Sequence, residues 1–386
     1  MNSIINLGMH PYADTFISKE QLKLSEPVYP LECCLDISNG LISLKYQTSP
    51  NERYNLYDYS YTSSNSDYSK SYWQNYFLDV SDKLKLNINS EILEIGSNDG
   101  YLLSRFKENN HKVLGVDSSK YISDLANKNN IETLNNIFDY KFAKKISQKF
   151  NLIIANNVFN HSNDPRDFLL GVKELLKTDG NFVFEVPYWF DTIKDGRFDQ
   201  IYHEHVSYFT IFSAVNILKE VGLYVYDVDH TEYHGGSIRV YSSSKKITLS
   251  SKLKALIKEE IDYGLFDVKF YEKYQESIDK TRSETLIKIH ELKLKNKKII
   301  AVGAAAKGNT YLNYYGLNNT LIDFVTDSSA YKIGKYTPLT RIPILSDEEV
   351  FSLYSEEVYV LILSWNISEI IKSKLKSIYK NINYIN

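Results

Sequence analysis

The chain has 386 residues, of which 43% are hydrophobic and 24% are charged, and its formal net charge is −3. This length allows more than one buried core, so we expect several domains. The small negative charge argues against a nucleic acid or an anionic membrane as the main partner. No apolar run reaches the roughly 18 residues that span a bilayer, and the first residues lack a signal-peptide pattern. The two cysteines, Cys33 and Cys34, are adjacent and form no disulfide framework, so we expect a cytoplasmic location.

The first 80 residues predict a small N-terminal lobe. They are polar and aromatic, with short strand-like runs such as Gly40–Leu44, and they end in the tyrosine-rich stretch Tyr57–Ser66. A surface loop is the simplest interpretation of that stretch.

Residues 81–245 alternate strand and helix patterns in the manner of a parallel sheet. Residues 246–297 hold Lys, Glu, Ile and Leu at helical spacing without proline, which predicts connecting helices. Residues 298–386 return to strand, turn and helix. The expected fold class is therefore α/β, with two Rossmann-like units and a small N-terminal lobe. The predicted strands are Glu91–Ile95, Lys112–Asp117, Asn151–Ala155, Gly180–Pro187, Lys298–Val302, Ile322–Asp327 and Val358–Leu363.

The turn Gly96–Gly100 follows the first strand of the middle unit and has the form of a cofactor loop. Backbone N–H groups in such a turn can approach an anionic or polar ligand, and an acid that ends the next strand, Asp117, suits a ribose diol. Only two glycines of the G-x-G-x-x-G pattern are present, which disfavours a nicotinamide cofactor and leaves S-adenosylmethionine. A turn without any ligand remains the alternative. The predicted cofactor-binding residues are Glu94, Gly96, Ser97, Asn98, Gly100, Asp117 and Asn156.

A second motif, Tyr202–His205, places two of the eight histidines on either side of a glutamate. It offers a general base, a carboxylate to orient it and a phenol to hold an oxyanion. The two histidines are two residues apart, so the H-E-x-x-H spacing of a zinc protease is not present.

Four motifs in order give a specific resemblance: Glu94–Gly100, Tyr202–His205, His234–Val240 and Gly303–Thr310. Together they resemble the S-adenosylmethionine-dependent sugar C-methyltransferases of deoxysugar biosynthesis, which act on nucleotide-linked keto sugars. The resemblance covers nearly the whole chain. It implies a class I methyltransferase domain at 81–245 and a Rossmann-like nucleotide-sugar-binding domain at 298–386. It also implies a monomer or weak homo-oligomer with a small-molecule substrate.

The resemblance implies carbon methylation next to a ketone, which needs a base and a partner for the enolate oxygen. We expect His205 to be the base, Glu204 to orient it or tune its pKa, and Tyr202 to donate to the oxygen. The enolate carbon then attacks the sulfonium methyl. Further residues expected at this cleft are Asn157 and His161, after a strand end, and Tyr61 or Tyr59 from the N-terminal lobe.

The turn Gly303–Asn309 is expected to cradle the substrate diphosphate, with Lys307 as counter-charge, unless it only caps a helix. Arg239 is expected to serve the sugar or to pair with an acid. His203 is included among the predicted substrate contacts, although a buried, packed side chain is the stronger interpretation of this residue. The other predicted substrate contacts are Gly303, Asn309, Asp327, Lys332 and Tyr336, with Arg341 as a further phosphate contact.

Relatives in that family carry zinc on paired C-x-x-C ligands in the N-terminal lobe, and this sequence departs from them. Leu7–Phe16 resembles the stretch after the first pair, but no cysteine precedes it, and Asp36 and Asn39 stand where the second pair is expected. Two adjacent thiols cannot complete a tetrahedral site. We therefore predict no structural zinc and no metal ligands. An O- or N-methyltransferase, and a degenerate non-catalytic homologue, remain as alternatives.

Overall fold

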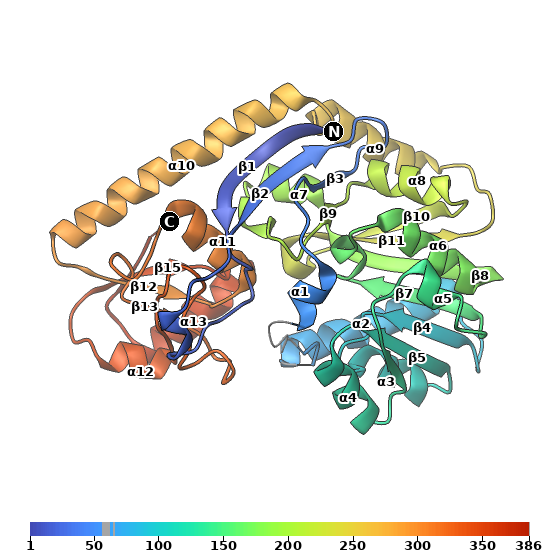
Figure 1. Ribbon diagram of the computed structural model, residues 1–386, viewed down its shortest axis with the longest axis horizontal. Helices are drawn as coiled ribbons and strands as arrows, with labels where there is room; N and C mark the ends of the chain where they lie inside the picture. Colours follow the sequence, from blue (N-terminus) through green and yellow to red (C-terminus); the bar gives the residue numbers. More distant parts are fainter. Residues whose placement is uncertain (56–61, 65, 386) are drawn as a thin grey trace.

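The computed structural model describes residues 1–55, 62–64 and 66–385. Within them the central sheet has seven strands in the order β10-β11-β8-β7-β4-β5-β6 (Figure 1). Strand β11 runs antiparallel to β8 and β10, and the pairs from β8 to β6 are parallel. The strands are β4 (Glu91–Ile95), β5 (Lys112–Asp117), β6 (Thr133–Asn135), β7 (Phe150–Asn156), β8 (Leu176–Pro187), β10 (Tyr224–Thr231) and β11 (Ser237–Ser243). This doubly wound arrangement confirms the expected fold class.

Both faces of the central sheet are covered, because its strands carry apolar residues on both sides. In β7, Ile153 and Ala155 belong to one buried cluster while Leu152 and Ile154 belong to another. Such continuous apolar runs are typical of a parallel sheet between two layers of helices. The covering helices are α2 (Asp67–Leu84), α3 (Tyr101–Glu108), α4 (Lys120–Lys128), α5 (Tyr140–Ala143), α6 (Pro165–Leu175) and α8 (Ile211–Glu220). The same unit also contains α7 (Trp189–Lys194) and the short 3₁₀ helices η2 (Phe159–His161), η3 (Phe198–Gln200) and η4 (Tyr233–Gly235).

The N-terminal lobe is a small antiparallel sheet in the order β1-β2-β3-β9. Its fourth strand comes from the segment directly after the Tyr202–His205 motif, so the lobe holds one end of that motif. Cys33 is fully buried in this lobe and lies in the apolar cluster that also contains Ile5 and Leu31. The elements are β1 (Asn2–His10), η1 (Gln21–Lys23), β2 (Tyr29–Leu35), β3 (Ile42–Leu44), α1 (Pro50–Asn55) and β9 (Ser207–Tyr208).

The C-terminal unit is a second Rossmann-like layer with five parallel strands in the order β14-β13-β12-β15-β16. Two helices, α9 (Ser251–Tyr263) and α10 (Val268–Leu294), connect it to the central sheet. Figure 1 shows α10 crossing the top of the molecule above β1 and β2. The elements are β12 (Lys298–Val302), α11 (Ala306–Tyr315), β13 (Phe324–Thr326), β14 (Ile344–Leu345), α12 (Asp347–Ser352), β15 (Val358–Ile362), η5 (Trp365–Ile367), α13 (Ser368–Ile378) and β16 (Ile382–Tyr384).

The segment after β1 joins the three parts of the molecule. The amide of Asn309 on α11 donates to the Ala13 carbonyl oxygen at 2.6 Å, and the Asp14 N–H donates to Glu204 Oε1 at 3.3 Å. Further along, Ile17 and Tyr336 exchange backbone hydrogen bonds. The N-terminal lobe therefore contacts both Rossmann-like units at the edge that carries the functional loops.

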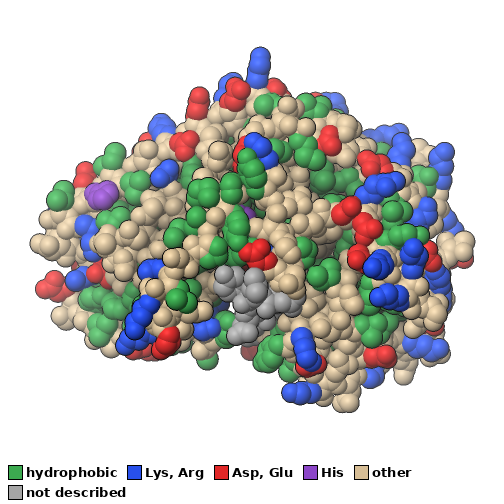
Figure 2. Space-filling model, in the orientation of Figure 1, with side chains coloured by type: hydrophobic (Ala, Val, Ile, Leu, Met, Phe, Trp, Pro, Cys, Tyr) green, Lys and Arg blue, Asp and Glu red, His purple; other side chains and the backbone are tan. Residues whose placement is uncertain are grey.

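The surface carries no dominant charge on the face seen in Figure 2, where acidic and basic side chains are interspersed. None of the described helices combines the length and the apolar character needed to cross a membrane. In the described part of the chain, no three His, Cys, Asp or Glu side chains gather where they could hold a metal ion. The absence of a structural zinc stays a prediction.

Candidate active site

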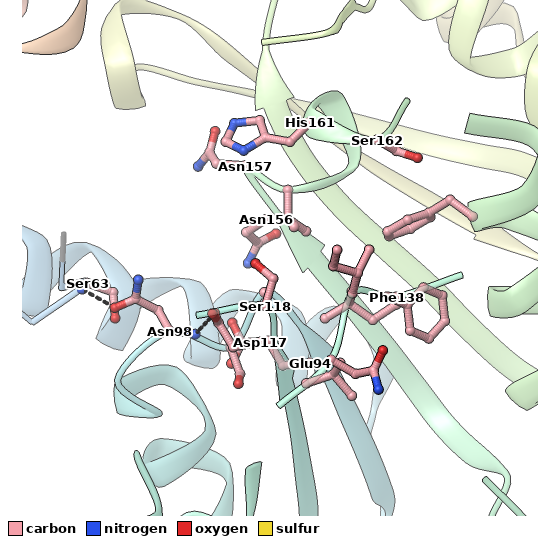
Figure 3. A pocket seen from close by; sticks show the side chains of 18 of the residues that line it. Ser63, Glu94, Asn98, Asp117, Ser118, Phe138, Asn156, Asn157, His161 and Ser162 are labelled. Carbon is pink, nitrogen blue, oxygen red and sulfur yellow. Dashed lines mark hydrogen bonds between the residues drawn. The ribbon is translucent and has the colours of Figure 1, made fainter. Parts of the chain in front are cut away.

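A pocket opens at the carboxyl ends of β4, β5 and β7, where ligands collect in doubly wound sheets. Figure 3 shows Asn157 and His161 at one end of it and the Ser63–Asn98 hydrogen bond at the other. Its lining includes all the predicted cofactor residues except Gly100, and also Pro50 and Ser63 from the N-terminal side. The ends of the strands and the loops after them supply Glu94, Gly96, Ser97, Asn98, Asp117, Ser118, Asn136, Phe138, Asn156, Asn157 and His161, and η4 supplies His234.

The loop after β4 has the geometry that its glycines predict. Gly96 has φ +71°, and a Cβ there would lie 2.8 Å from the Val158 side chain. Gly100 has φ +79° and precedes α3, so it shapes the turn without lining the pocket. The Asn98 N–H donates to Asp117 Oδ2 at 3.0 Å, which ties the loop to the acid at the end of β5.

Several polar atoms of this pocket have no protein partner, which is the condition expected of a ligand site. Glu94 Oε2, Ser97 Oγ and Asn157 Oδ1 are buried without a hydrogen bond. Burial, with Asp99 and Asp117 nearby, raises the pKa of Glu94 well above its usual value, and burial also raises the pKa of Asp117. These acceptors suit the hydroxyl and amino groups of S-adenosylmethionine, so the residues present fit that cofactor.

His205 lies beside this pocket, in the loop between η3 and β9, and its two ring nitrogens have different partners. Nδ1 lies 3.0 Å from the Gln200 carbonyl oxygen, and Nε2 lies 2.7 Å from the Tyr202 hydroxyl. A carbonyl oxygen can only accept, so Nδ1 carries the proton and Nε2 accepts from Tyr202. The His205 ring centroid is 5.2 Å from that of His161, which lines the pocket. The motif and the pocket therefore adjoin.

The environment keeps His205 neutral. Burial lowers its pKa to about 3, the Gln200 carbonyl opposes that shift, and the charge of Lys307 adds to it. Burial likewise lowers the pKa of His161 well below its usual value and that of His234 to about 3. All three imidazoles are thus uncharged at neutral pH, which is the form that a general base requires.

Glu204 does not contact His205, which differs from the role expected for it. One of its oxygens accepts from the Asp14 N–H, and the other, Oε2, is buried without a partner. Burial, reinforced by Asp14, raises the pKa of Glu204 to about 7. The orienting group for His205 is the Gln200 carbonyl, a backbone atom that no residue-type pattern reveals.

His203 takes the packed role. It is fully buried, its Nε2 lies 3.4 Å from the Pro30 carbonyl oxygen, and its ring meets the rings of Tyr12 and Tyr29 edge-on.

Lys307 reaches the motif from the C-terminal unit. Its ammonium group donates to Asn366 Oδ1 at 2.7 Å and lies 4.4 Å from the centre of the Trp365 ring, which Arg197 also contacts at 4.3 Å. Trp365 Nε1 donates to Asp199 Oδ2 at 2.7 Å. Burial lowers the pKa of Lys307 to about 8, and its charge in turn depresses the pKa of His205 and His234.

Sequence reasoning missed four members of this group: Arg197, Asp199, His234 and Trp365. A signal for Trp365 was available, because it follows β15, and β15 lies next to β12, which precedes the Gly303 turn. Loops after adjacent parallel strands meet at one edge of the sheet. The close fit also depends on Gly235, where a Cβ would lie 2.3 Å from the Trp365 ring.

The remaining predicted substrate residues of the C-terminal unit make contacts within the protein. Gly303 has φ +96°, and a Cβ there would lie 2.2 Å from Ser364 Oγ. Asp327 accepts from the Ala304 and Ser329 N–H groups, and Lys332 donates to the Ala304 carbonyl oxygen at 2.6 Å. Together with the contacts of Asn309 and Tyr336 to the N-terminal segment, these bonds hold the Gly303 turn in place. Arg341 also pairs within the protein, with Glu26 at 3.1 Å.

Arg239 lies in a buried ion pair and does not line the pocket. Its Nε donates to Glu185 Oε2 at 2.9 Å, and its guanidinium lies 4.1 Å from the centre of the Tyr76 ring. This corresponds to the acid-pairing alternative for Arg239. Tyr59 and Tyr61 lie outside the described residues.

Two parts of the chain match known protein families. Residues 68–228 match a methyltransferase domain, and residues 232–384 match the C-methyltransferase C-terminal domain. C-methyltransferase NovU from Streptomyces niveus is 27% identical over 384 residues, which cover 98% of this chain and 90% of the relative.

Among solved structures, an S-adenosylmethionine-dependent methyltransferase from Clostridium acetobutylicum is 15% identical, with a TM-score of 0.38 over 47% of this chain and 94% of that one. A TehB-like methyltransferase from Corynebacterium glutamicum is also 15% identical, with a TM-score of 0.35 over 45% and 88%. The domain matches and the NovU relative cover both Rossmann-like units. The chain is therefore an S-adenosylmethionine-dependent methyltransferase that carries the C-terminal domain of C-methyltransferases.

Proposed function

We propose that the protein methylates the carbon next to the ketone of a nucleotide-linked keto-deoxysugar. The observation that carries this proposal is the Tyr202–His205 pair beside the methyl-donor pocket. A neutral imidazole and a phenol are the two groups that enolate formation needs, and methyl transfer to oxygen or nitrogen needs no partner for an enolate oxygen.

In the proposed reaction, His205 Nε2 takes the proton from the carbon. The electron pair of the broken C–H bond becomes the enolate, and the Tyr202 hydroxyl turns from Nε2 to the enolate oxygen. The Gln200 carbonyl accepts from Nδ1–H throughout and stabilises the imidazolium that forms. Bound S-adenosylmethionine would supply an electrophilic methyl carbon, and the enolate carbon is the nucleophile for it.

The group around Trp365 supports an anionic substrate. Two cations, Lys307 and Arg197, lie against the same indole ring, and Lys307 is close enough to the motif to affect the pKa of His205. A substrate diphosphate held there would place its sugar between the two Rossmann-like units. We therefore assign Lys307 to the diphosphate.

The direct test incubates the protein with isotopically labelled methyl donor and a panel of nucleotide-linked keto sugars. The expected result is label on a ring carbon of one sugar, identified by mass spectrometry and NMR. Label on oxygen or nitrogen would contradict carbon methylation. Label on a substrate without a nucleotide would contradict the substrate class.

The pH dependence of kcat/KM tests Lys307. Because its pKa in the free enzyme is about 8, the ammonium charge is present below pH 8 and is lost above it. We expect kcat/KM for the substrate to fall about tenfold per pH unit above pH 8. Lys307→Arg should remove this decline, since a guanidinium keeps its charge, and Lys307→Met should lower kcat/KM and abolish the decline. An alkaline limb that survives in Lys307→Met would exclude this role.

A further inference from the structure

The N-terminal segment reaches the methyl-donor pocket at two places. The first is Arg53 on α1, which is 5% exposed and donates to the His161 carbonyl oxygen at 3.1 Å and to Asn163 Oδ1 at 2.5 Å. The second is the pair Ser63 and Ser64. Both lie before residue 68, where the match to the methyltransferase domain begins. The pocket is therefore built in part from residues outside that domain.

Ser63 and Ser64 dock on the loop after β4. The Ser63 N–H donates to Asn98 Oδ1 at 2.8 Å, as Figure 3 shows, and its hydroxyl donates to Asp99 Oδ1 at 2.5 Å. The Ser64 N–H and hydroxyl both donate to Asp99 Oδ2, at 3.1 and 2.5 Å. One carboxylate thus receives three hydrogen bonds from two consecutive residues.

Asp99 is fully engaged by these contacts. It is 5% exposed, and its Oδ1 also accepts from the Tyr101 N–H at 3.3 Å. Its neighbours Ser97 and Asn98 line the donor pocket, whereas Asp99 does not and faces the two serines. Ser63 does line the pocket. Any effect of Asp99 on the donor site therefore has to pass through Ser63 and Asn98.

We propose that Asp99 is a positioning residue for methyl-donor binding, which fixes the Ser63–Ser64 turn so that Ser63 forms part of the pocket wall. Hydrogen bonds to an ionised acceptor are stronger than neutral ones, and a buried donor that loses its acceptor is costly. Without the carboxylate the turn has no strong acceptor on the loop, so the wall opens and the donor loses contacts. The affinity for S-adenosylmethionine then depends on the docked N-terminal segment.

The test is a mutant cycle on the full chain, with S-adenosylmethionine binding measured by calorimetry below each variant's melting temperature. Asp99→Asn, and the double variant Ser63→Ala with Ser64→Ala, should each raise Kd about tenfold, as expected for one lost charged contact. The triple variant should raise it no further, because one contact cannot be lost twice. Ser64→Thr keeps the hydroxyl and should keep the wild-type Kd.

Asp124→Asn serves as the control, because this exposed acid on α4 pairs with Lys120 and does not line the pocket. It should leave Kd unchanged. An unchanged Kd in Asp99→Asn, or a triple-variant effect equal to the product of the two separate effects, would overturn the proposal. If Asp99→Asn does not fold, the double variant Ser63→Ala with Ser64→Ala becomes the test. A wild-type Kd in that double variant would reject the positioning role of Asp99.

Discussion

Replacing His205 with alanine is expected to abolish exchange of the substrate's α hydrogen with solvent deuterium and to lower kcat by about 10²- to 10⁴-fold. Nε2 is the ring nitrogen that carries a lone pair, because Nδ1 carries its proton toward Gln200. Nε2 takes the substrate proton when the Tyr202 hydroxyl turns from it to the substrate oxygen. The imidazole of His161 lies 5.2 Å away, centre to centre. The measurement is NMR of the substrate in deuterated buffer, with and without methyl donor.

Two variants make this result specific. Tyr202→Phe keeps the aromatic ring and leaves His205 in place, so we expect slower methylation with exchange reduced but still detectable. His230→Ala removes a half-exposed histidine that pairs with Asp191 outside the pocket, and both rates should stay at the wild-type level. Wild-type exchange in His205→Ala would remove this residue from the base role.

Local patterns were sufficient to predict the central strands of both Rossmann-like units. Strands β4 and β5 have the bounds that the sequence predicts, because short apolar runs between turn residues are a strong local signal. Gly96, Asp117 and Asn157 meet for a topological reason. They lie at or directly after the ends of three neighbouring parallel strands, and the carboxyl ends of such strands share one edge.

The details around His205 could not be predicted in this way. Glu204 is its neighbour in sequence, but in an irregular loop adjacent side chains point in different directions, and Glu204 turns to Asp14 instead. The group that His205 Nδ1 contacts is a backbone carbonyl, which every residue carries. Likewise, the approach of Lys307 and Trp365 to the Tyr202–His205 motif depends on how the C-terminal unit packs on the central one, and no periodicity in the sequence encodes that packing.

The second large effect is expected on stability, from Arg239→Met. Arg239 and Glu185 lie opposite each other on β11 and β8, and Glu185 is fully buried. Removing one partner of a buried ion pair leaves an uncompensated charge, which costs about 3–5 kcal/mol. The Tyr72 hydroxyl, 2.5 Å from Glu185 Oε1, is too weak a partner to offset this loss. Urea unfolding of the variant should show the decrease directly.

The dependence of this loss on pH has a definite sign. Burial already raises the pKa of Glu185, and the Arg239 charge opposes that rise, so the variant raises it further. Because a raised carboxyl pKa means that the folded state binds more protons, stability falls as pH increases past the unfolded pKa. The deficit of Arg239→Met should therefore be larger at pH 8 than at pH 5.

A double variant and a kinetic measurement separate this structural role from the substrate role first predicted for Arg239. Adding Glu185→Leu to Arg239→Met removes the stranded charge and should restore most of the lost stability. If Arg239 instead held the sugar, the free energy of unfolding of Arg239→Met would stay within about 1 kcal/mol of the wild-type value, which is the error range of such a comparison. The KM for the substrate would then rise. The backbone link from the Asn157 N–H to the Glu185 carbonyl oxygen, at 2.7 Å, places the pair directly beneath the donor pocket. A stable variant with a high KM would therefore show that Arg239 binds the substrate and does not only support the pocket.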